Sequence, residues 1–364
     1  MEHGNNQTNL SADLDLLHGT IPPELLNPDG YRRLTAVADM LPASLTNFWG
    51  LESRLHEPMP LTDILFEVKR NTPGHRLLAG QYTSSLDQLC RMYPLWQQIR
   101  SFAAQWIQHQ SFMNKHILNL WLEFDTEKPI SWEAASGLIG LPSVFLGLRS
   151  AELTMDELHE LLSQSCDLLQ ISGETLENVI SFIGSIPQPG QLFQLGSMLG
   201  RPCRDIRLCI NKLNPLLIPD WLKDMGWRGN AKALKAVFDM LAPAVRTLAV
   251  DLNFTGTGIS EKIGIECYLD WDRKDTDNWA DFLDELSEYV CIHPSKRSGL
   301  LRYPGEVPLP ASRRKETSDT LSLMLFKMIH HIKLGFHDGG ITDAKAYLAI
   351  YRPGIQPDNN WLVD

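Results

Sequence analysis

The sequence lacks the cysteine pattern of a disulfide framework or a zinc site. Its six cysteines are widely spaced and include no Cys-x-x-Cys pair, so we expect reduced structural thiols. It also lacks an apolar run of the ~18 residues that are needed to span a bilayer. Residues 1–15 are polar and acidic, without the basic-then-apolar order of a signal peptide. We therefore expect a cytoplasmic protein with no membrane span.

Positive charge is also scarce. The net formal charge is −11, and the longest basic run is Arg313-Arg314-Lys315, so nucleic acid is not expected as a partner. The chain contains no Gly-x-x-x-x-Gly-Lys, no helix-opening Gly-x-Gly-x-x-Gly and no Gly-x-Ser-x-Gly, which disfavours nucleotide-binding folds and α/β hydrolases. With 43% hydrophobic and 21% charged residues, the 364-residue chain has the composition of a globular protein.

What the sequence does contain is a set of short segments in which apolar and polar residues alternate. Such alternation predicts β-strands with two different faces. The segments form five pairs, separated by helical sequence: 48–55 with 63–70, 118–125 with 143–149, 194–200 with 206–213, 246–255 with 262–271, and 331–337 with 345–352. Five helix-helix-strand-strand units would supply ten antiparallel strands, a number that closes readily into a barrel and so removes exposed edges.

The segments between the strand pairs predict helices. They cover residues 31–41, 84–110, 154–169, 173–184, 219–225, 230–241, 275–290 and 318–328. Thr154 followed three residues later by Glu157 predicts a capping box at the start of the third helix. Residues 302–312 hold three prolines and predict a loop. We therefore expect an α+β fold, with a loosely ordered lead-in over residues 1–28 and one barrel domain with outer helices over residues 29–364.

The two faces of each predicted strand differ in chemistry. One face is apolar, as at Leu120, Val250 and Leu334, and we assign it to the outer helices because they also need an apolar surface to cover. The opposite face mixes charged residues with His, Tyr and Trp. An open sheet with one wetted face and a closed barrel with a polar chamber both fit this pattern. Tyrosine and tryptophan beside charged groups favour the chamber.

Two groups of side chains that often bind metals occur, and neither predicts a metal site. Adjacent residues on a strand point to opposite faces, so His330 and His331 should diverge, and at most His331 and His337 share a face. Without a cysteine or a third histidine nearby, metal binding there is not expected. The acidic run at 270–277 lies at a strand-to-helix junction, where carboxylates favour the start of a helix more than a Mg²⁺ site.

In the order of its elements and the chemistry of its inner strand faces, the chain resembles the aromatic prenyltransferases with an ααββ barrel, called ABBA prenyltransferases. The resemblance covers residues 31–354. Lys345-Ala346-Tyr347, followed by Tyr351 on the same face, looks like the alternating Lys-x-Tyr strand of that family. Glu123 in the segment 121–125 resembles the strand glutamate that accepts a hydrogen bond from an indole nitrogen in many fungal-type members.

The resemblance implies roles for residues on the polar strand faces. Lys and Arg side chains would hold an isoprenoid diphosphate and ease its departure: Lys69, Arg149, Arg207, Lys262, Lys333 and Lys345. Tyrosine rings would shield the allylic cation: Tyr268, Tyr347 and Tyr351. Glu123 would orient or deprotonate the acceptor, and the other acceptor-binding residues would be Trp121, Asp125, Asp251 and Glu266. The implied activity is transfer of an isoprenoid group from an allylic diphosphate to an aromatic or peptide acceptor in natural-product biosynthesis.

The number of acids on the polar faces keeps other functions open. Glu67, Glu123, Asp125, Asp251 and Glu266 share these faces, whereas a diphosphate pocket should be net positive. No cofactor is required, but the acids could bind Mg²⁺. They could also grip a basic peptide or natural product in a tailoring enzyme without a prenyl donor. A third function is non-catalytic binding of a planar apolar ligand. A net-positive chamber would indicate the first function, a net-negative one the second, and a chamber too narrow for two ligands the third.

Overall fold

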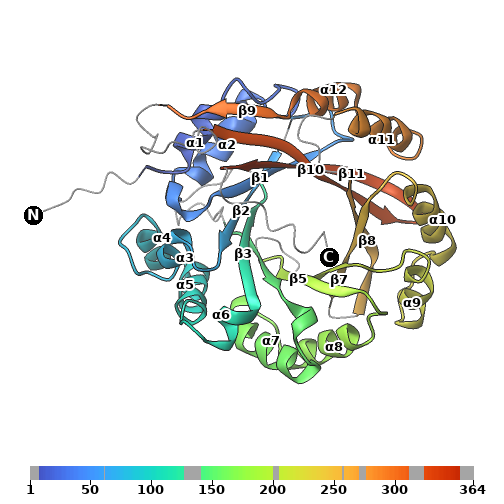
Figure 1. The fold of residues 1–364 in the computed structure, drawn as a ribbon, viewed down its shortest axis with the longest axis horizontal. Helices are drawn as coiled ribbons and strands as arrows, with labels where there is room; N and C mark the ends of the chain where they lie inside the picture. The colour runs from blue at the N-terminus through green and yellow to red at the C-terminus, as the bar shows by residue number, and fades with distance from the viewer. Residues whose placement is uncertain are drawn as a thin grey trace, which may run out of the picture.

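Antiparallel strands close into a barrel at the centre of the molecule (Figure 1). This computed structural model describes residues 8–60, 62–126, 141–199, 205–255, 258–269, 276–310 and 324–352. The barrel strands are β1 (Phe48–Arg54), β2 (Thr62–Lys69), β3 (Ile117–Phe124), β4 (Ser143–Leu148), β5 (Gln191–Ser197), β6 (Ile206–Asn211), β7 (Thr247–Thr255), β8 (Gly258–Tyr268), β10 (Met324–His337) and β11 (Gly340–Tyr351). Chain neighbours pair from β1 to β8, then β8 pairs with β10, β10 with β11, and β11 with β1. The predicted ten-stranded antiparallel barrel is therefore confirmed, and the open-sheet alternative is wrong.

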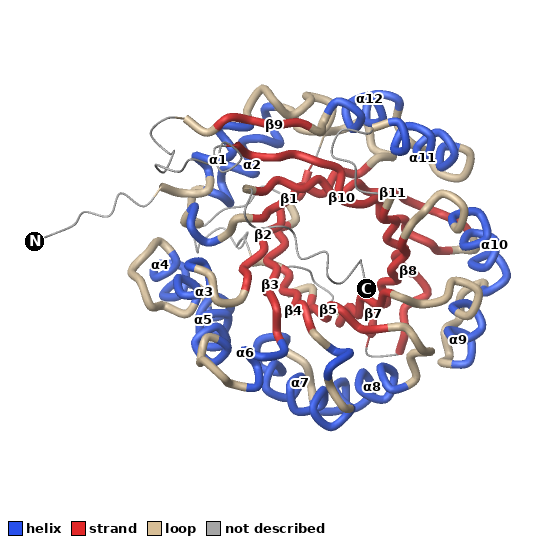
Figure 2. The backbone as a smooth tube through the Cα atoms, in the orientation of Figure 1, coloured by secondary structure: helices blue, strands red, loops and turns tan. Residues whose placement is uncertain are grey.

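Helices lie on the outside of the barrel (Figure 2). They are α1 (Ser11–Leu17), α2 (Pro28–Ala38), α3 (Pro73–Leu78), α4 (Leu86–Met92), α5 (Pro94–Trp106), α6 (Phe112–His116), α7 (Met155–Leu169), α8 (Gly173–Gly184), α9 (Ile218–Asp224), α10 (Ala231–Leu241), α11 (Asp277–Ser287) and α12 (Pro294–Arg302), with short 3₁₀ turns η1 (Ala43–Leu45) and η3 (Ser150–Glu152). The helices are amphipathic: α10, for example, buries Leu234, Phe238 and Leu241 at helical spacing. The capping box of Thr154 and Glu157 forms at the start of α7. None of the described helices is long and apolar enough to cross a membrane.

The apolar strand faces form the core between the barrel and the helices. Leu120, Val250 and Leu334 are at most 1% exposed and belong to one hydrophobic cluster that includes the helical side chains. The predicted orientation of the apolar face is therefore confirmed. Since the other face of each strand points inward, the same alternation that builds this core also decides which side chains line the barrel.

Two segments near the C-terminal end differ from the sequence-based prediction. β10 begins at Met324, so the end of the helix expected over 318–328 is strand, while its start lies outside the described residues. The described part of the loop expected over 302–312 contains β9 (Gly305–Pro308), which pairs with the first residues of β10. Met324 to Ile329 are buried or half-buried on both faces. A strand that is covered on both sides loses the period-two pattern by which strands are recognised.

The N-terminal segment also differs from the expected loose lead-in. Leu10, Leu14 and Leu17 of the α1 region are buried in the main core. Arg352, just after β11, donates two hydrogen bonds to the buried carboxylate of Asp13, at 2.9 and 2.8 Å. From residue 8 onward, the segment is thus packed against the barrel and joined to its last strand.

Opposite faces of β3 should respond differently to truncation. Leu120→Ala removes a side chain packed under the helices, and we expect a loss of about 2–5 kcal/mol in the free energy of unfolding. Asn119→Ala, on the inner face, removes no core packing and should cost less than about 1.5 kcal/mol, the usual contribution of one hydrogen bond. Urea denaturation of both variants measures the difference. Equal losses would contradict the assignment of the two faces.

Candidate functional site

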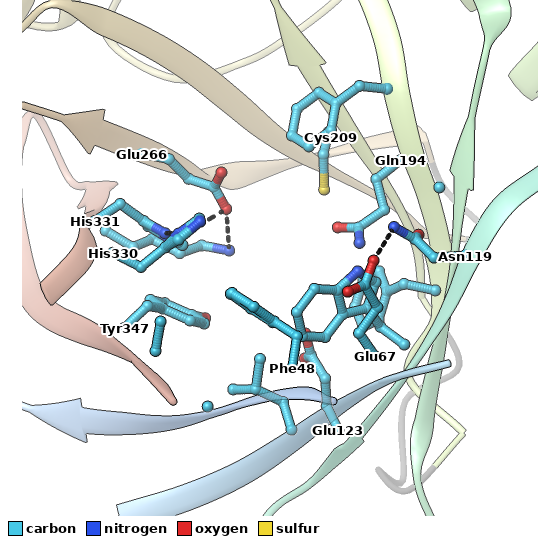
Figure 3. Close-up of a pocket in the computed structure, with 18 of the residues that line it drawn as sticks. Phe48, Glu67, Asn119, Glu123, Gln194, Cys209, Glu266, His330, His331 and Tyr347 are labelled. Carbon is cyan, nitrogen blue, oxygen red and sulfur yellow. Dashed lines mark hydrogen bonds and ion pairs between the residues drawn. The ribbon is translucent and has the colours of Figure 1, made fainter. Parts of the chain in front are cut away.

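The inner faces of the barrel strands enclose a chamber (Figure 3). The space between its atoms is about 1030 Å³, including some that opens to solvent. The charged lining residues are Glu67, Glu123, Arg207, Asp251, Glu266 and Lys333, and the aromatic ones include Phe48, Trp121, Phe145, Phe193, Tyr268 and Tyr347. A mostly apolar concave site with a few polar groups is the usual form of a small-molecule site.

The structure brings together eight of the predicted site residues. The chamber is lined by these eight: Glu123, Trp121, Arg207, Asp251, Glu266, Tyr268, Lys333 and Tyr347. The other six predicted site residues do not line it: Lys69, Arg149, Lys262, Lys345, Tyr351 and Asp125. The six lie near strand ends or on parts of the strands that extend past the chamber. Strand alternation predicts a side chain's face but not its depth along the barrel.

Three of the expected diphosphate-binding cations are held away from the chamber by acids. Arg149 follows β4, is 42% exposed at its side chain, and lies 3.6 Å from the Glu152 carboxylate. Lys262 is 52% exposed and pairs with Asp343 at 2.6 Å. Lys345 donates to Glu52 at 2.6 Å.

The remaining three residues outside the chamber lie at strand ends. Lys69 is the last residue of β2, and Asp125 is exposed just after β3. Tyr351 is buried in a small apolar cluster, where its ring stacks on those of Phe48 and Phe326 at centroid distances of 6.2 and 5.6 Å. It is therefore not placed to shield a cation in the chamber.

The two cations that do line the chamber are embedded in a network with acids. Lys333 forms a salt bridge with Asp251, and its Nζ lies 3.6 Å from Glu266 Oε1. Arg207 Nε donates to Asn253 Oδ1 at 2.9 Å. Burial would raise the pKa of Asp251, but Lys333 and Arg207 outweigh this effect and lower it. Asp251 is therefore ionised at neutral pH.

Glu266 behaves differently from its neighbour. Burial, followed by repulsion from Asp251, raises the pKa of Glu266 to about 7. The Tyr268 hydroxyl donates to its carboxylate at 2.6 Å. Glu266 therefore changes protonation near neutral pH, as a group that exchanges protons with a substrate must do.

The chamber lining carries more acid than base. Four carboxyl groups, those of Glu67, Glu123, Asp251 and Glu266, face two permanently positive groups among the described residues, Arg207 and Lys333. Burial lowers the pKa of His330 to about 4 and that of His331 well below its usual value, so neither ring adds positive charge at pH 7. This part of the lining is net negative, which is the result expected for a site that takes a basic substrate.

Both members of the histidine pair line the chamber, so the expectation that they diverge is wrong. The pairing of β10 with β11 shifts register between Ile329 and His331. A bulge of this kind places an extra residue in one strand and breaks the strict alternation of faces. The Nδ1 atoms of His330 and His331 lie 2.7 Å apart, and His331 stacks on Tyr347 at 4.3 Å between ring centroids. His337 instead pairs with Asp338 at the hairpin turn.

Uncharged residues complete the site. Asn119 Nδ2 donates to Glu67 Oε1 at 2.7 Å, and Gln194 and Cys209 line the wall nearby (Figure 3). A Cβ atom at Gly147 would lie 2.1 Å from Asn119 Oδ1, so glycine is needed there for the amide to fit. Asn119 and Gly147 lie on the polar faces predicted from the sequence, but nothing in their residue types indicates a chemical role.

No group of three or more His, Cys, Asp or Glu side chains in the described residues is arranged to hold a metal ion. The acidic run at 270–277 lies almost entirely outside the described residues. A role for Mg²⁺ therefore stays a prediction.

The raised pKa of Glu266 should appear in the pH dependence of stability. A carboxyl group whose pKa is higher in the folded state stabilises that state below its unfolded pKa, near 4.5, and this contribution is lost as the pH rises to about 7. The Glu266→Gln variant has no carboxyl group at this position, so its free energy of unfolding does not fall in this way. Its free energy of unfolding relative to the wild type should therefore increase between pH 4.5 and 8, by up to about 3 kcal/mol. Urea unfolding at several pH values measures this, and a difference that does not change with pH would contradict the assignment.

The sequence matches no family model and no curated protein, whereas the fold matches solved structures. The chain is similar to the prenyltransferase PriB in its apo form, with a TM-score of 0.55 and 15% sequence identity over 93% of this chain and 95% of that one. It is also similar to AnaPT from Neosartorya fischeri, with a TM-score of 0.55 and 11% identity over 95% of this chain and 92% of that one. These neighbours are aromatic prenyltransferases, and the chain has their closed antiparallel barrel, as its resemblance to the ABBA family implies.

Proposed function

We propose that the protein transfers an isoprenoid group from an allylic diphosphate to an aromatic or peptide acceptor inside the barrel chamber. The observation that carries the proposal is a chamber inside a closed, prenyltransferase-like barrel, where the cations Arg207 and Lys333 of the described lining lie beside aromatic rings. Arg207 Cζ is 6.0 Å from the centroid of the Phe145 ring, and Lys333 Nζ is 5.9 Å from that of Tyr347. The reaction would belong to natural-product biosynthesis, and a cytoplasmic location stays a prediction.

These contacts suit the departure of a diphosphate. Arg207 and Lys333 would bind its oxygens and stabilise the negative charge that develops as the bond from the allylic carbon to oxygen breaks. The electron pair leaves with the diphosphate, and the allylic group becomes cationic. The rings of Tyr347 and Tyr268 would stabilise that cation, with ~0.5–2 kcal/mol for each cation–π contact.

On the acceptor side, Glu123 would orient the nucleophile and take its proton. The acceptor's electron pair forms the new bond to the allylic carbon, and the proton displaced from the acceptor passes to the Glu123 carboxylate. Trp121, on the same face of β3, would pack against the acceptor. Diphosphate is the other product, so the bond that breaks, the bond that forms and the displaced proton are all accounted for.

The acid excess of the chamber favours a second candidate function. A barrel-type tailoring enzyme that acts on a basic peptide or natural product, without a prenyl donor, would need acids more than cations. Binding of a planar apolar ligand by a non-catalytic protein receives no comparable support, because burying this many charged groups beside an uncharged ligand is costly. Donor binding separates the first two functions.

Donor binding should depend on Arg207 and not on Arg149. Arg207→Ala removes charge-assisted hydrogen bonds to phosphate, each contributing roughly 1.5–3 kcal/mol, so affinity should fall about tenfold to a hundredfold or more. Arg149→Ala is the matched control, because this side chain pairs with Glu152 outside the chamber. Calorimetry with dimethylallyl or geranyl diphosphate measures both. If the wild type binds neither donor, the proposed prenyl transfer is wrong.

Glu123→Gln should slow the chemical step by ~10²–10⁴-fold and leave donor affinity nearly unchanged, since the variant keeps the size but loses the basicity. The acceptor for the assay is chosen by screening indoles, phenols and peptides with dimethylallyl diphosphate and the wild type. Glu152→Gln serves as the control at an exposed carboxylate.

A structural role for Glu123, as the partner of Arg149, does not fit the register. Glu123 lies opposite Ser143 at one end of the β3–β4 hairpin, whereas Arg149 follows the other end. An unaltered rate combined with a lower melting temperature would nevertheless assign Glu123 to structure and remove it from the acceptor site.

A further inference from the structure

One part of the chamber lining holds both of the cations found among the described lining residues. The neighbouring strands β6, β7, β8 and β10 carry Arg207, Asp251, Glu266 and Lys333, which we call the β6–β10 wall. When both carboxyl groups are ionised, their two negative charges offset the two positive ones. A diphosphate site should be net positive, so this wall suits the donor better when one of its carboxyl groups is protonated.

The contacts of Lys333 place Glu266 next to any anion that binds this wall. Lys333 lies directly opposite Glu266 in the β8–β10 register, and its Nζ is 3.6 Å from Glu266 Oε1. A diphosphate oxygen that bonds to Lys333 Nζ at ~2.8 Å would lie at most about 6–7 Å from Glu266 Oε1. Two negative charges this close repel strongly in a site of low dielectric. A bound diphosphate and an ionised Glu266 therefore disfavour each other.

The groups around Glu266 determine which of them takes up a proton. They are Asp251 from β7, Tyr268 from β8, His330, His331 and Lys333 from β10, and Arg207 and Cys209 from β6. Asp251 stays ionised, because Lys333 and Arg207 lower its pKa by more than burial raises it. Burial raises the pKa of the thiol and of the phenol and lowers the pKa of both imidazoles, so these four groups stay neutral. Glu266, with a pKa of about 7, is left as the group that is protonated most easily.

A buried ring nitrogen of His331 gives a second, independent indication. His331 is only 7% exposed, and its Nε2 has no hydrogen-bond partner among the described residues. Nε2 points toward Glu266 (Figure 3) but lies 3.7 Å from Oε1, too far for a hydrogen bond. When His330 Nδ1 donates to His331 Nδ1, the proton of the neutral His331 ring is on Nε2. Because a buried donor left unpaired is costly, this N–H needs an acceptor, and a phosphate oxygen bound beside Lys333 is one.

We propose that the diphosphate of the donor binds the β6–β10 wall together with a proton taken up by Glu266, which then donates a hydrogen bond to the diphosphate as a carboxylic acid. The Tyr268 hydroxyl donates to Glu266 Oε2 at 2.6 Å, so Oε1 is the oxygen that carries the proton. Arg207 and Lys333 supply the positive charge, and His331 Nε2 supplies a further N–H donor. The proton comes from solvent, and the O–H bond on Glu266 is the one covalent bond that forms. The inference rests on the proposed function in placing a diphosphate here.

The test is calorimetric binding of dimethylallyl diphosphate between pH 6 and pH 8.5. Below pH 7 Glu266 already holds its proton, whereas above pH 7 donor binding must include proton uptake, so the affinity of the wild type should fall about tenfold or more by pH 8.5. Glu266→Gln is uncharged at every pH and carries an N–H donor. Its affinity should match that of the wild type within about twofold at pH 6 and exceed it about tenfold at pH 8.5. Loss of a merely structural side chain would not strengthen binding.

Titrations at pH 8 in Tris and in Hepes, which differ in their heats of ionisation, count the protons directly. The wild type should take up between about half a proton and one proton more than Glu266→Gln on binding the donor. Glu123→Gln is the matched control, because it removes a carboxyl group of the same chamber outside the β6–β10 wall and should keep the proton uptake of the wild type. Melting temperatures check that both variants are folded.

The outcomes separate this inference from the proposed function. Donor binding by the wild type without proton uptake at pH 8 would overturn the inference and leave prenyl transfer standing. Uptake that survives in Glu266→Gln, or that disappears in Glu123→Gln, would do the same. If the wild type binds no donor even at pH 6, where Glu266 is protonated, the proposed prenyl transfer is itself wrong, and the inference is wrong with it.

Discussion

Closure of the sheet through β10 and β11 is the constraint on which the rest of the structure depends. β10 pairs with β8 on one side and β11 on the other, while β11 returns to β1. Once the sheet is closed, each strand has an outer face, which the helices cover, and an inner face, which lines the chamber. The apolar outer face then supplies the core, and the charged inner face is held in a confined space of low dielectric.

That confinement explains the chemistry of the inner wall. In water, Asp251 and Glu266 would ionise in the same way. Inside the barrel, Lys333 forms a salt bridge with Asp251, whereas burial, followed by repulsion from Asp251, raises the pKa of Glu266 to about 7. One strand neighbour is thus a permanent anion and the other a group that exchanges protons near neutral pH. The difference arises because Lys333 and Arg207 together lower the pKa of Asp251 by more than burial raises it, whereas at Glu266 burial and repulsion from Asp251 outweigh them.

Much of the fold could be predicted from the sequence because strand alternation is a local signal. Ten segments with one apolar face specify both the barrel and its orientation, and the inward direction of Glu123, Arg207 and Lys333 follows from the same pattern. Prediction failed where the local signal is lost. Residues 324–329 are covered on both sides and show no alternation, and the bulge before His331 lets two adjacent histidines share one face.

The sequence by itself determined which side chains face inward, since a period of two leaves only two choices for each residue. It could not determine which of them reach the chamber, because depth along the barrel and pairing between distant strands arise only on closure. Lys345 is inward by pattern, yet it is held by Glu52, which is nearly three hundred positions away in the sequence. Only the tertiary structure brought Lys333 to Asp251 and Asn119 to Glu67. The balance of charge in the chamber is therefore a property of the closed barrel.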